Sequence, residues 1–119
     1  MSDDEPTMTY LADMTSLVEV ATDSTVSRTI LKGEGARLVL FSFDTGQALS
    51  EHTAAMPVLL QALDGSLEVT ASGQTVTLNP GDVIHLPTRL PHSVVALAPS
   101  RLLLSMLDPR QAAPLKPTH

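Results

Sequence analysis

Short apolar runs, each ended by a turn-forming residue, recur along most of this chain. They occupy residues 26–31, 37–43, 58–63, 67–71, 75–78, 83–86, 93–97 and 101–107. Runs of this length, bounded by glycine, proline, asparagine or aspartate, are typical of β-strands. About eight short strands with no convincing helix between them predict an all-β fold, either a barrel or a sandwich of two sheets.

Two of these runs are apolar at consecutive positions, around residues 39–43 and 102–107. A strand with one face in water should alternate between apolar and polar residues, so the outer face of these strands should be covered. A second copy of the chain is the predicted cover. The alternative is that residues 10–20 fold back over this face. Residues 11–20 suggest one short helix, capped by Asp13 or Thr15.

The chain of 119 residues is long enough for one core and one domain. Residues 1–9 are acidic and poor in apolar side chains, which predicts a disordered N-terminus. Residues 109–119 are rich in proline, which predicts a flexible C-terminal tail. The domain is therefore expected to span residues 10–108.

The charge balance argues against nucleic acid as a partner. The net charge is -6, and the seven basic residues are scattered rather than clustered. No apolar run approaches the roughly 20 residues that span a bilayer, and no secretory signal pattern is present. The chain has no cysteine and hence no disulfide or thiolate metal site. These features predict a cytoplasmic protein that does not bind membranes.

Glycines, a proline and histidines recur at two sets of spacings that carry a family resemblance. The first set is Gly46, His52 and Gly65, and the second is Gly81, Pro87 and His92. This pattern resembles the two sequence motifs of the cupin superfamily. The resemblance implies a cupin-type double-stranded β-helix, also called a jelly-roll barrel, over roughly residues 26–107. It also favours a homodimer, because cupins commonly pair sheet to sheet.

The resemblance implies a metal site that this sequence does not complete. The family's first motif has a His-x-His pair followed by a glutamate, and its second motif supplies a further histidine. Here His52 and His92 match, but Ala54 stands at the second histidine and Val58 at the glutamate. Two histidines are fewer than the three protein ligands normal for a catalytic zinc site.

His85 is the main candidate for a substitute ligand, because it lies two residues before Pro87. If its side chain points inward, the barrel holds three histidines. If Ile84 and Leu86 are the inward pair, His85 faces out, and this is the favoured alternative. Arg89 replaces a glycine of the second motif. It could hold an anionic substrate, although a solvated turn arginine is favoured.

The sequence therefore predicts a protein that binds a small molecule and has an incomplete metal site. The predicted pocket residues are His52, Ala54, Val58, Leu60, His85 and His92, with His52 and His92 as possible metal ligands. The expected cofactor is none, or a weakly held divalent metal (Zn, Fe, Mn or Ni). The alternative is a metal-dependent cupin enzyme of the dioxygenase, isomerase or cyclase type that uses His52, His92 and His85. Whether the protein is an enzyme stays open.

Overall fold

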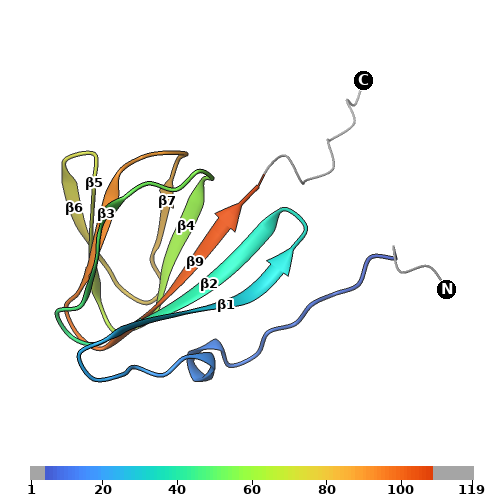
Figure 1. Cartoon of the computed structure of the whole chain (residues 1–119), viewed down its shortest axis with the longest axis horizontal. Helices are drawn as coiled ribbons and strands as arrows, with labels where there is room; N and C mark the ends of the chain where they lie inside the picture. The colour runs from blue at the N-terminus through green and yellow to red at the C-terminus, as the bar shows by residue number, and fades with distance from the viewer. Residues whose placement is uncertain (1–4, 109–119) are drawn as a thin grey trace.

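The computed structural model describes residues 5–108, and in these residues nine strands form two sheets that face each other (Figure 1). The five-stranded sheet contains, in spatial order, β1 (Thr25–Gly33), β2 (Ala36–Phe43), β9 (Ser100–Leu107), β4 (Val58–Asp64) and β7 (Val83–Leu86). The four-stranded sheet contains β3 (Ala48–His52), β8 (His92–Ala96), β5 (Leu67–Ala71) and β6 (Gln74–Leu78). Neighbouring strands pair antiparallel throughout both sheets. This arrangement confirms the predicted all-β jelly-roll barrel.

Each predicted strand is present, and β3 is an additional one. Its sequence, Ala-Leu-Ser-Glu-His, has one large apolar side chain, Leu49, so its hydrophobic pattern is too weak to identify it. The predicted helix over residues 11–20 is reduced to a single 3₁₀ turn, η1 (Met14–Leu17). Asp13 precedes this turn with φ 52° and makes no side-chain capping bond, and Val18 is already extended. A β-branched residue is a poor continuation for a helix.

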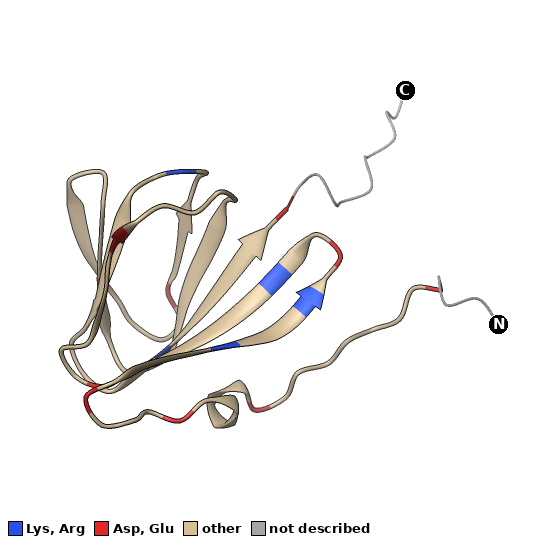
Figure 2. Cartoon of the chain, viewed as in Figure 1, with Lys and Arg blue, Asp and Glu red and all other residues tan. Residues whose placement is uncertain are grey.

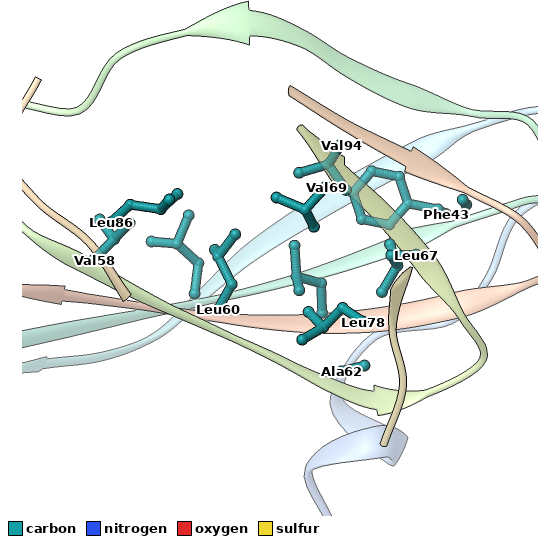
Figure 3. Close-up of a cluster of buried hydrophobic side chains, with 12 residues drawn as sticks. Phe43, Val58, Leu60, Ala62, Leu67, Val69, Leu78, Leu86 and Val94 are labelled. Atoms are coloured by element: carbon teal, nitrogen blue, oxygen red, sulfur yellow. The ribbon is translucent and has the colours of Figure 1, made fainter. Parts of the chain in front are cut away.

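The main core lies between the two sheets. Its buried residues come from β2 and from β4 to β9, and alternate residues face it, as on β4, where Val58, Leu60 and Ala62 are buried while Gln61 is exposed. Figure 3 shows side chains from both sheets pointing toward one another. The twelve buried members are Phe43, Val58, Leu60, Ala62, Leu67, Val69, Leu78, Leu86, Val94, Ala96, Leu102 and Leu104.

A second, smaller cluster lies on the outer face of the five-stranded sheet. Leu40 and Leu103 are buried there against Val18, with Met14 and Leu17 packed beside them. The N-terminal segment thus covers part of this face, and in Figure 1 its 3₁₀ turn lies below the strands of this sheet. Of the two predicted covers for this face, the structure shows the N-terminal segment, which was the alternative to a second copy of the chain.

Three side-chain hydrogen bonds hold this segment to the sheet. Arg101 Nε donates to the Val18 carbonyl at 2.8 Å, Arg28 donates to the Leu17 carbonyl at 2.8 Å, and Ser42 Oγ donates to the Glu19 carbonyl at 2.7 Å. The homodimer stays a prediction, which the mass of the protein in solution would test.

The expectations for the two ends of the chain fall largely outside the described part. Residues 1–4 and 109–119 are not described, so the predicted disorder and the flexible tail are untested there. Residues 5–9 lie outside any strand and are exposed. Among residues 5–108, no helix is long and apolar enough to cross a membrane.

Candidate functional site

Two histidines lie side by side on the inner face of the four-stranded sheet. His52 on β3 is the direct cross-strand partner of His92 on β8. Their ring centroids are 4.3 Å apart, and the ring planes are inclined at 59°. His92 is buried at 3% exposure, whereas His52 is exposed to solvent. The structure therefore brings together the two histidines that the sequence singled out.

Backbone hydrogen bonds fix the tautomer of both rings. Nδ1 of His52 lies 2.8 Å from the Ser50 carbonyl oxygen, and Nδ1 of His92 lies 2.9 Å from the Leu90 carbonyl oxygen. A carbonyl oxygen can only accept, so each Nδ1 must carry the proton. In the neutral ring, Nε2 is then left with an available lone pair. The pair can accept hydrogen bonds from a ligand or coordinate a cation through Nε2.

A cavity of about 310 Å³ opens beside the two histidines. Its wall is mostly apolar, and the histidines and Thr53 provide the polar side chains. The lining residues are Val39, Phe41, His52, Thr53, Ala54, Ala55, Met56, Val58, His92, Leu104 and Met106. A few polar groups in an otherwise apolar cavity are the usual form of a small-molecule site.

Four of the six predicted pocket residues line this cavity: His52, Ala54, Val58 and His92. Leu60 shares the inward direction of Val58 but lies deeper, as a core residue with 1% exposure, and is not part of the wall.

His85 does not join the other two histidines. On β7 it pairs with Leu59, whereas its neighbours Ile84 and Leu86 pair with the inward-facing Leu60 and Val58. Side chains alternate along a strand, so Ile84 and Leu86 are the inward pair and His85 faces out. Its side chain is exposed and borders a separate hollow of about 210 Å³ at the open seam between β6 and β7. The three-histidine arrangement is therefore not formed.

The donor set around His52 and His92 does not fit a catalytic metal centre. Among residues 5–108, no group of three or more His, Cys, Asp or Glu side chains comes together. Ala54 and Val58 present hydrocarbon to the cavity at the positions where the family supplies ligands. A catalytic zinc site normally has three protein ligands and one open position, and this site offers only two imidazoles.

The residues at the outer end of this cavity were not predicted from the sequence. A second cavity of about 290 Å³ is lined by Lys32, Gly33, Ala36, Arg37, Met56, Met106, Leu107 and Asp108. It shares Met56 and Met106 with the histidine cavity, so the two adjoin. Arg37 has the same parity on β2 as Val39 and Phe41, and this alternation is the signal that could have identified it.

The comparison with protein families finds the Cupin domain family over residues 39–106, which is more than half of the chain. No curated protein is significantly similar to this chain.

Solved structures with the same fold are numerous. A conserved protein of unknown function from Streptococcus pyogenes is 26% identical, with a TM-score of 0.76, over 87% of this chain and 91% of that one. A cupin superfamily protein from Desulfitobacterium hafniense is 25% identical, with a TM-score of 0.76, over 86% and 93%. A variant of salicylate 1,2-dioxygenase from Pseudoaminobacter salicylatoxidans is 17% identical, with a TM-score of 0.65, over 73% and 27%. The last likeness concerns the fold alone.

The match over residues 39–106 includes β3, β4 and β8, whose paired histidines and apolar wall form the site. From this match and from the two facing sheets, the chain belongs to the cupin domain family.

Proposed function

We propose that this cupin binds a small, weakly polar organic molecule in the cavity beside His52 and His92, with no requirement for a metal. The observation that carries the proposal is the fixed tautomer of both histidines at an apolar cavity. Two Nε2 atoms at one end can accept hydrogen bonds, and the hydrocarbon wall can desolvate the rest of the ligand. The preferred ligand carries a hydroxyl donor on an apolar body.

The alternative function, a metal-dependent cupin enzyme, needs more ligands than the site provides. Its predicted third histidine, His85, lies on the outer face, and neither Ala54 nor Val58 can coordinate a cation. Binding without metal is therefore the better supported function, and the test below also includes the outcome expected of a metal-dependent enzyme.

The test uses 4-methylphenol as a probe, because it combines one hydroxyl donor with an apolar ring. Binding is followed by protein-observed NMR, with and without a chelator. The hydroxyl donates one hydrogen bond, to either Nε2, so we expect the double variant His52→Phe/His92→Phe to weaken binding about fivefold, the equivalent of one hydrogen bond of ~1 kcal/mol, and each single substitution to weaken it by less. His85→Phe is the matched control, because it makes the same change at an exposed position outside the cavity.

Equal weakening by all three substitutions would show that the probe binds elsewhere. The metal-dependent enzyme hypothesis would be supported instead if binding required added zinc, iron, manganese or nickel and a chelator abolished it.

A further inference from the structure

We propose that Arg37 and Lys32 form an anion-binding end to the same cavity, so that the ligand is an elongated molecule with a carboxylate at one end and a hydroxyl-bearing apolar part at the other. This inference rests on the proposed function and adds a class of ligand to it. The predicted candidate for an anion contact, Arg89, lines neither cavity.

The two basic residues face each other on neighbouring strands. Lys32 on β1 is the direct cross-strand partner of Arg37 on β2, and both line the outer cavity. Figure 2 shows basic residues side by side on these strands near their hairpin. Like charges placed directly opposite each other are destabilising. Neither side chain makes a hydrogen bond or an ion pair with another described residue. An anion between them would relieve the repulsion.

A single row of paired residues connects these cations to the histidine cavity. Across the five-stranded sheet, Lys32 pairs with Arg37, Arg37 with Met106, and Met106 with Val58. Met106 and Val58 belong to the wall of the histidine cavity. Two strand spacings separate Arg37 from Val58, which is about 10 Å. A ligand that reaches from the histidines along this row arrives at the two basic side chains.

The protein has a net charge of -6, but the charges around the outer cavity favour an anion there. Its lining contains two cations, Lys32 and Arg37, and one carboxylate, Asp108. Arginine can hold a carboxylate through two parallel hydrogen bonds, which gives direction as well as attraction. The two cations are exposed, so the attraction should weaken with added salt.

The test compares 3-(4-hydroxyphenyl)propanoate with its uncharged amide, which differs only at the anionic end. We expect the acid to bind about fivefold more tightly than the amide at low salt, and this preference to shrink at high salt. In an Arg37→Gln/Lys32→Gln variant, the preference for the acid over the amide should disappear. Arg89→Gln is the matched control, because it removes one positive charge outside both cavities.

Each result is informative about one of the two proposals. Equal binding of acid and amide to the native protein would overturn the anion site and leave the histidine cavity intact. Loss of the preference in Arg89→Gln alone would overturn the assignment to Arg37 and Lys32. Binding of neither probe would overturn both proposals. One further measurement needs no variant. In NMR spectra of the native protein, the Arg37 side-chain Nε–H signal should shift when the acid is added and not when the amide is added.

Discussion

His52 on β3 lies directly opposite His92 on β8. Both rings are on the inner face of the sheet because β3 contains one extra residue between Leu49 and His52. Leu49 pairs with Val94 and His52 pairs with His92, so three steps along β3 match two steps along β8. Without this bulge, strict alternation from the inward-facing Leu49 would turn His52 outward. The irregularity at Ser50 and Glu51 therefore creates the histidine pair.

The wild-type site should hold little metal, and restoring the family's ligands should change that. We expect the purified protein to contain well under one equivalent of zinc, iron, manganese or nickel by elemental analysis. Ala54→His with Val58→Glu should raise zinc affinity at least about tenfold in calorimetric titration, because it completes a four-ligand set. The same pair of changes in a His92→Ala background is the control. Stoichiometric metal in the native protein, lost in His52→Ala/His92→Ala, would contradict this prediction.

Gly65 should tolerate no side chain. Its φ of 74° is in the left-handed region, and a β-carbon there would overlap the Ser100 hydroxyl and the Pro99 carbonyl. Strain and overlap together predict a loss of about 2–4 kcal/mol in unfolding free energy for Gly65→Ala. Gly73 has a similar φ of 67° with open space around it, so Gly73→Ala should lose about 1–2 kcal/mol. Urea denaturation measures both, and equal losses would mean that the overlap relaxes.

Asp44 should make stability sensitive to acid. Its carboxylate accepts a backbone N–H from Asp23 at 2.8 Å and another from Thr45 at 2.9 Å. These bonds, that from Asp23 first, hold the pKa of Asp44 below its ordinary value. A lowered pKa in the folded state adds stability above the pKa of the unfolded chain, and this stability is lost as pH falls through the folded pKa.

Asp44→Asn should therefore lower the melting temperature at pH 7, and the gap from the native protein should close toward pH 2–3. Glu68→Gln, on the outer face of β5, is the control for removing a negative charge. A gap that stays constant from pH 7 to pH 2 would argue against this role for Asp44.

Arg101 should anchor the N-terminal segment. It donates to the Val18 carbonyl and also contacts the Asp64 carboxylate at 2.7 Å, with both side chains partly exposed. Arg101→Gln should cost about 1–2 kcal/mol of unfolding free energy and increase protease cleavage between residues 10 and 24. Arg89→Gln serves as the matched control. Unchanged cleavage in Arg101→Gln would show that the apolar contacts of Val18 and the bonds from Arg28 and Ser42 hold the segment without Arg101.

The all-β fold and the incomplete metal-binding motif could be predicted from the sequence alone. Turn residues such as Asp64-Gly65 mark where strands end, and the alternation of Val58, Leu60 and Ala62 identifies a face that must be buried. The replacement of two ligands by Ala54 and Val58 is a matter of residue identity, which no fold can alter. These features were predictable because they depend on local conformation and side-chain chemistry.

Which face of each strand points inward, and which strands become neighbours, depends on the tertiary structure. Alternation relates His85 to Ile84 and Leu86, but only the pairing of β7 with β4 shows that His85 faces out. The bulge in β3 reverses the parity that Leu49 would give to His52. The placement of Arg37 at the end of the histidine cavity depends on β2, β9 and β4 lying side by side. Each of these facts rests on hydrogen bonds between residues distant in the chain, because a side-chain period of two gives relative directions within a strand and never the absolute one.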